Sequence, residues 1–97
     1  MIRNIIKPIS TSIRQVVRLG EHFIIREDHY EFKGRSNIYC LNNDEVIWYA
    51  ELPSEDDVYS NEIKVTENDT LKTSSWNGFT VEIDIENGKI LEKYFTK

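Results

Sequence analysis

The alternation of apolar and polar residues predicts a β meander over the last third of the chain. Val81, Ile83 and Ile85 alternate with polar residues, and this run lies between two Asn-Gly pairs, Asn77-Gly78 and Asn87-Gly88. Asn-Gly is typical of tight hairpins because it supplies the positive φ angles that such turns need. The pattern predicts three antiparallel strands, over residues 70–76, 79–85 and 89–96.

The same reasoning predicts further strands over residues 12–19, 22–27, 30–33, 37–41, 45–51 and 62–66. Gly20 fits the first central position of a type II′ turn, and Pro53 ends a strand by removing an amide donor. The isoleucines before residue 10 have helical spacing, but Pro8 interrupts it, so we expect an arm or a helical turn. We therefore predict an all-β fold of about seven to nine strands, as a two-sheet sandwich or one strongly bent sheet.

A weak internal repeat links the two halves of the chain. Residues 38–42 and 45–48 mirror residues 80–84 and 88–91, at an offset of about 42 residues. In both copies an apolar run ends in a polar residue, a turn follows, and a second apolar run begins. This resembles the strand-turn-strand portion of a quinoprotein-type β-propeller blade. A closed propeller uses roughly four to eight blades and this chain has room for two, so a closed propeller is excluded.

Composition indicates one folded domain over residues 1–97. Of the 97 residues, 39% are hydrophobic and 11% aromatic, enough for a single core. No apolar run is long enough to cross a bilayer, and the first residues lack the apolar centre of a signal peptide. The single cysteine, Cys40, agrees with a reducing compartment. We expect a cytoplasmic protein with no membrane partner.

The charge is acidic and unevenly distributed. The net charge is −5, so nucleic acid is not expected as a direct partner. Residues 42–69 carry nine acidic side chains against Lys64 alone. Such a segment either steers a basic partner toward the protein or forms a solvated loop that maintains solubility.

Candidate chemistry is sparse. Cys40 lies in an alternating strand, where a buried thiol is the ordinary explanation. His22 and His29 lack a third ligand at a spacing that metal sites use, and no nucleophile motif or phosphate-binding glycine loop is present. We expect no catalytic residues, no metal and no cofactor, and therefore no enzyme.

The aromatic residues are more informative. In the strand 45–51, alternation predicts Val46, Trp48 and Ala50 on one face and Ile47 and Tyr49 on the other. This strand either lies between the sheet and the N-terminal arm, or uses Trp48 or Tyr49 as an interface anchor.

Tyr59 is a separate aromatic candidate. It lies on the acidic stretch 54–60, where an aromatic side chain has little structural reason to be, and it is therefore a candidate anchor.

The whole-chain character, the meander from residue 37 to 97 and the segment 51–59 resemble the immunity proteins of contact-dependent growth inhibition and related polymorphic toxin systems. The resemblance implies that the chain binds a cognate toxin domain, commonly a basic nuclease, and covers its active site. The partner-binding residues expected on this basis are Asp44, Trp48, Tyr49, Glu51, Glu55, Asp56, Asp57, Tyr59 and Glu62. The alternatives are an assembly module that pairs through exposed β edges and a small ligand-binding or enzymatic barrel.

Overall fold

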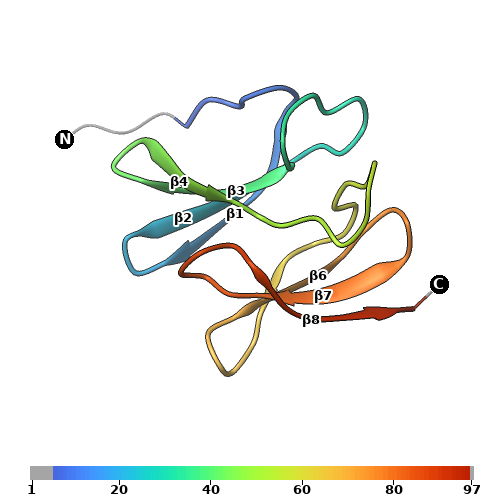
Figure 1. Cartoon of the computed structure of the whole chain (residues 1–97). Helices are drawn as coiled ribbons and strands as arrows, with labels where there is room; N and C mark the ends of the chain where they lie inside the picture. The colour runs from blue at the N-terminus through green and yellow to red at the C-terminus, as the bar shows by residue number, and fades with distance from the viewer. Residues whose placement is uncertain (1–5, 97) are drawn as a thin grey trace.

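The computed structural model describes residues 6–96, and over these residues the chain forms eight β-strands and no helix (Figure 1). The strands are β1 (Ile13–Leu19), β2 (His22–Glu27), β3 (Ile38–Asn42), β4 (Glu45–Tyr49), β5 (Lys64–Val65), β6 (Leu71–Ser74), β7 (Phe79–Ile83) and β8 (Ile90–Phe95). They build two four-stranded antiparallel sheets, ordered β1-β2-β3-β4 and β5-β6-β7-β8. The all-β prediction is confirmed, with two separate sheets.

One predicted strand is absent, and one of the two alternatives predicted for the N-terminal segment is observed. Residues 30–33 form a turn and irregular backbone, because Glu31 adopts a φ of 58° that ends any extended run. Residues 6–11 form an arm without a helical turn, and residues 1–5 of the expected arm lie outside the described residues. The internal repeat falls on β3–β4 and β7–β8, the last two strands of each sheet.

Two hairpins of the first sheet have two-residue turns. Gly20 has a φ of 62° between the paired residues Leu19 and His22, in agreement with the predicted type II′ turn. In the β3–β4 turn both central residues, Asn43 and Asp44, have positive φ angles of 53° and 66°, which is the signature of a type I′ turn. This turn therefore places a non-glycine residue where glycine is preferred.

The Asn-Gly pairs behave differently from the prediction. Only the glycines have positive φ, 100° at Gly78 and 75° at Gly88. The Gly78 amide donates to the Ser75 carbonyl (3.1 Å), and the Ser75 amide donates to the Phe79 carbonyl (2.8 Å). At Gly78 this hydrogen-bond pattern is a type I turn followed by a left-handed glycine, as in three-residue hairpins.

A bulge changes the faces predicted for β4. Cys40 pairs with Trp48, but Leu41 pairs with Val46, so Ile47 is an extra residue on β4. Cross-strand partners share a face, so Val46 lies with Leu41 and not with Trp48. The strict alternation predicted for residues 45–51 is therefore wrong at this position.

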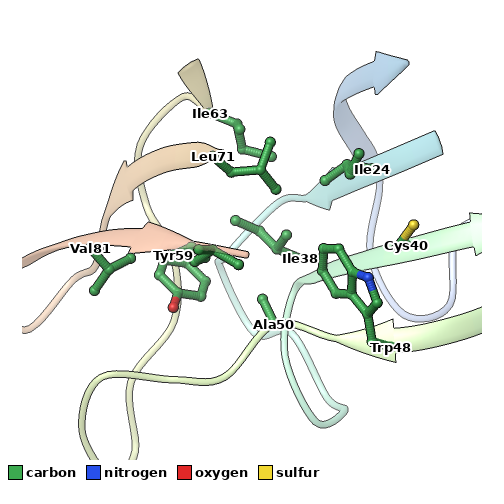
Figure 2. Close-up of a cluster of buried hydrophobic side chains, with 10 residues drawn as sticks. Ile24, Ile38, Cys40, Trp48, Ala50, Tyr59, Ile63, Leu71 and Val81 are labelled. Atoms are coloured by element: carbon green, nitrogen blue, oxygen red, sulfur yellow. The ribbon is translucent and has the colours of Figure 1, made fainter. Parts of the chain in front are cut away.

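One hydrophobic core lies between the two sheets. Side chains from both sheets point toward one another, with Ile38 between Tyr59 and Trp48 (Figure 2). The buried members are Ile24, Ile38, Cys40 and Trp48 from the first sheet, Leu71, Val81 and Ile83 from the second, and Ala50, Tyr59 and Ile63 from the connection between them.

The opposite face of the first sheet is covered by the N-terminal arm. Glu27 is fully buried, and its carboxylate accepts hydrogen bonds from the amides of Ile9 (2.5 Å), Ser10 (3.0 Å) and Thr11 (2.9 Å) and from the Tyr39 hydroxyl. Burial alone would raise the pKa of Glu27, but the Tyr39 hydroxyl and these amides lower it below its ordinary value. The ionised carboxylate therefore fastens the arm to the sheet.

Two side-chain amides hold the connection between the sheets. The fully buried Asn37 donates to the carbonyls of Glu27 (2.9 Å) and Tyr59 (2.8 Å) and accepts from the Tyr59 amide (2.9 Å). Gln15 donates to the Ile63 carbonyl (2.8 Å) and accepts from the Ile63 amide (2.7 Å). Each side-chain amide both donates to a backbone carbonyl and accepts from a backbone amide, as a paired β-strand does. The backbone polar groups of the connection therefore have hydrogen-bond partners although they lie outside the sheets.

Candidate protein-binding surface

Tyr59 is a core residue, so the prediction of an interface anchor at this position is wrong. Its side chain is fully buried in the cluster that joins the two sheets, and its hydroxyl donates to the Glu51 carbonyl. Burial first, and then the charges of Asp57 and Glu51, raise the pKa of its phenol. The reason for this aromatic is tertiary, since Tyr59 lies on the connection between the two sheets, where Asn37 bonds its backbone and Ser75 pairs with it.

Trp48 is also buried. Its indole Nε1 donates to the Ile85 carbonyl (2.9 Å), and Gly88 lies against its ring so closely that a Cβ there would come within 2.7 Å of Trp48 Cδ2. The Glu51 amide donates to the Gly88 carbonyl (2.8 Å). Trp48 therefore holds the β7–β8 loop against the first sheet and is not exposed for a partner.

Asp57 stabilises the loop that carries it. Its buried carboxylate accepts hydrogen bonds from the Ser54 hydroxyl (2.6 Å) and from the amides of Val58 (2.9 Å) and Asn77 (3.0 Å). These bonds tie residues 54–57, here called the acidic loop, to residues 75–78, here called the Trp76 turn. Asp57 is thus a structural carboxylate, not the exposed acid that the charge pattern predicted.

Further bonds fix the acidic loop to the Trp76 turn. The Asn77 side-chain amide donates to the Ser54 hydroxyl (3.1 Å) and to the Glu55 carbonyl (3.4 Å). The Trp76 amide donates to the Val58 carbonyl (2.8 Å). Glu55 and Asp56 are exposed on the loop held in this way. The loop therefore presents two carboxylates from a backbone that the rest of the fold positions.

The other predicted residues are spread over the molecule. Asp44 lies in the hairpin turn before β4, at the opposite end of that strand from Glu51 and the acidic loop (Figure 1). The Glu51 carboxylate accepts from the Ile90 amide (2.9 Å), and Glu62 is exposed just before β5. Tyr49 is half-buried under the Arg35 guanidinium, 5.3 Å from its ring centroid. Only Glu55 and Asp56 remain as neighbouring exposed acids of the predicted set.

The structure adds aromatic residues that sequence reasoning missed. The Trp76 side chain is 61% exposed and stacks on His29, with ring centroids 5.5 Å apart and planes inclined by 29°. Tyr30, next to His29, is 72% exposed. We call His29, Tyr30 and Trp76 the aromatic ledge. The available signal was the position of Trp76 directly before Asn77-Gly78, because hairpin turns lie at the surface.

A groove of about 430 Å³ lies beside the acidic loop. Its walls come from the loop between β2 and β3 and from residues 52–58. The apolar lining is Phe32, Leu52 and Val58, and the charged lining is Arg35, Asp56 and Asp57. This end of the molecule therefore combines exposed acids, exposed aromatics and a concave surface.

Two features of the described residues bear on reactive chemistry, the single cysteine and the placement of potential metal ligands. Cys40 is buried, and burial first and then the charge of Glu86 raise the pKa of its thiol to about 11, which disfavours the nucleophilic thiolate. Within residues 6–96 no three His, Cys, Asp or Glu side chains lie close enough together to hold a metal ion. The same part of the chain has no helix of a length and apolarity that could cross a membrane.

Comparisons with known proteins place the chain in a family. No curated protein matches it, and no solved structure does. A family model described as a domain of unknown function, DUF7957, matches residues 6–95, which covers both sheets and the acidic loop. The chain therefore belongs to the DUF7957 family.

Proposed function

We propose that the chain is an immunity protein that binds a cognate bacterial toxin domain, most simply a basic nuclease, and covers its active site. The observation that carries the proposal is the acidic loop, in which the buried carboxylate of Asp57 and the side chain of Asn77 hold the exposed Glu55 and Asp56 in place. The protein acts by binding and not by catalysis, in the cytoplasm where the toxin would act.

The chemistry of the acidic loop suits a nuclease. A nuclease active site binds phosphate groups through cationic side chains, and exposed carboxylates can occupy the same positions. A loop already fixed by hydrogen bonds loses little conformational entropy on binding, so more of the interaction energy contributes to affinity. The net charge of −5 adds long-range attraction to a basic partner and raises the association rate.

The first experiment asks whether the chain protects cells. The reading frames next to this chain's gene are searched for a toxin domain, which is expressed in a host cell with and without the chain while growth and RNA integrity are measured. We expect growth and intact RNA only when the chain is present. Unchanged toxicity, or the absence of any binding between the two purified proteins, would reject the immunity function.

The second experiment locates the interface. The double variant Glu55→Gln with Asp56→Asn should slow association with the toxin domain about tenfold at low salt, with a smaller difference at high salt. The control variant Glu67→Gln with Asp69→Asn removes the same charge from the exposed β5–β6 turn. Asp57 is left intact because it stabilises the fold. Equal slowing by both variants would assign the effect to net charge and remove the acidic loop from the interface.

A second candidate function is that of an assembly module. β8 is the last strand of its sheet, and its exposed residues include Leu91 (55% exposed) and Phe95 (61% exposed). An exposed edge with apolar side chains is a template for pairing with another β-strand. Sedimentation velocity over a hundredfold concentration range tests this function, which predicts association that Leu91→Lys abolishes.

A further inference from the structure

Two residues of the aromatic ledge, Tyr30 and Trp76, are exposed, and the third, His29, is half-buried and stacks on Trp76. Tryptophan side chains contribute much of the binding energy at protein interfaces, because a large apolar ring is removed from water there. A tryptophan that is exposed outside the core can be buried in this way only by a partner. One face of the Trp76 ring is occupied by His29, and 61% of the side chain remains exposed. The ledge is thus a supported aromatic surface and not a flexible side chain in solvent.

The residues around the aromatic ledge favour a positively charged ligand. The turn that carries Trp76 is bonded to the acidic loop through the Asn77 side chain and the Val58 carbonyl. The exposed carboxylates of Glu55 and Asp56 therefore belong to the same end of the molecule as the indole. An aromatic face at the same end of a molecule as exposed carboxylates attracts a cation, through the ring quadrupole and through charge-assisted hydrogen bonds.

We propose that the aromatic ledge, together with Glu55 and Asp56, binds the guanidinium group of an arginine side chain on a partner protein. A planar guanidinium stacks on an indole and presents paired N–H groups that match a carboxylate, whereas a lysine ammonium is a compact and more strongly hydrated charge. The identity of the partner rests on the proposed function, but the arginine chemistry is independent of it.

The test uses two synthetic peptides of equal length, one with three arginines and one with three lysines at the same positions. Binding is followed by NMR through the indole N–H signals of the two tryptophans. The indole N–H signal of Trp76 should shift as the arginine peptide is added and reach a plateau at saturation. The lysine peptide should bind at least about threefold more weakly. Trp48 serves as an internal reference, because its indole N–H is buried and donates to the Ile85 carbonyl.

Variants separate stacking from simple charge attraction. Trp76→Ala should weaken binding of the arginine peptide at least about fivefold, as expected for loss of a cation–π contact at a surface. Tyr94→Ala removes another exposed aromatic, on β8, and should leave binding unchanged. An unshifted Trp48 signal establishes that each variant is folded. Equal affinity for both peptides, or equal effects of the two alanine variants, would overturn the proposal.

The outcomes also separate this proposal from the immunity function. Arginine-peptide binding at Trp76 without binding of any toxin domain would reject immunity and retain the ledge. Toxin binding that Trp76→Ala leaves unchanged, with no peptide shift at Trp76, would reject the ledge and retain immunity.

Discussion

Replacement of Asn37 by aspartate should make the stability of the protein strongly dependent on pH. The buried Asn37 amide donates to two carbonyl oxygens at 2.8 and 2.9 Å, so in the variant a carboxylate oxygen would face these acceptors. The variant must either keep an unpaired buried charge or bind a proton. Protonation of an aspartate at pH 7 costs up to about 4 kcal/mol, since its ordinary pKa is about 3.9 and each pH unit corresponds to about 1.36 kcal/mol.

The protonated aspartate still restores only one of the two donors. One buried carbonyl then lacks its partner, at a cost of about 1–3 kcal/mol. We therefore expect a loss of stability of about 5–7 kcal/mol at pH 7 and of about 1–3 kcal/mol near pH 4. The sign follows from linkage: the folded variant has a raised pKa and binds a proton that the unfolded chain has released, so its stability falls as pH rises.

Urea unfolding of the wild type and of Asn37→Asp at several pH values between 4 and 7 measures this dependence. Asn37→Ala is the matched control, because it also leaves the Tyr59 backbone unpaired but adds no titrating group. Its loss of stability should not vary with pH. A constant difference between wild type and Asn37→Asp across the range would refute the assigned hydrogen bonds.

Three other predictions address the turns and the core. Gly88→Ala should lower the free energy of unfolding by about 2–4 kcal/mol, because the new Cβ would be strained at a φ of 75° and would also collide with Trp48. Gly20→Ala should lower it by only about 1 kcal/mol, because a φ of 62° strains the residue but the space around it is open. Thermal unfolding of the two variants compares these losses. Asp44→Gly should stabilise the protein by about 0.5–1 kcal/mol, because its φ of 66° suits glycine, and an unchanged urea midpoint would contradict the type I′ assignment. Cys40 should resist alkylation by iodoacetamide at pH 8 until the protein is denatured, and rapid labelling of the native protein, followed by mass spectrometry, would contradict its burial and raised pKa.

Local patterns determined much of the fold. Alternation and turn residues placed all eight strands of the described residues within two residues of their observed bounds, because a half-buried antiparallel strand has a period of two. The predicted type II′ turn at Gly20 is consistent with the structure for a similar reason, since the required φ is a property of the residue itself. The one predicted strand that is absent lies over residues 30–33. Their composition suits a strand, but the positive φ of Glu31 turns the backbone there.

The candidate surface was predicted less well. Charge density singled out residues 54–57, and of the acids there Glu55 and Asp56 are exposed. It could not distinguish them from Asp57, whose carboxylate is buried by its bonds to Ser54 and to the amide of Asn77. The partners of Asp57 that decide its role include a residue 20 positions away, a contact that no local pattern encodes.

The sequence by itself determined the β class, most strands and the acidic character, since these depend on neighbouring residues and on a sum of charges. Only the tertiary structure decided which aromatics are buried. Tyr59 lies in the core because the connection that carries it packs between the two sheets. Trp48 is covered by a loop whose Gly88 is 40 residues later in the chain. Trp76 lies in the turn between β6 and β7, where His29 stacks on its ring and 61% of the residue stays exposed. Burial depends on what packs across from a side chain, and that partner is set by chain topology and not by adjacent residues.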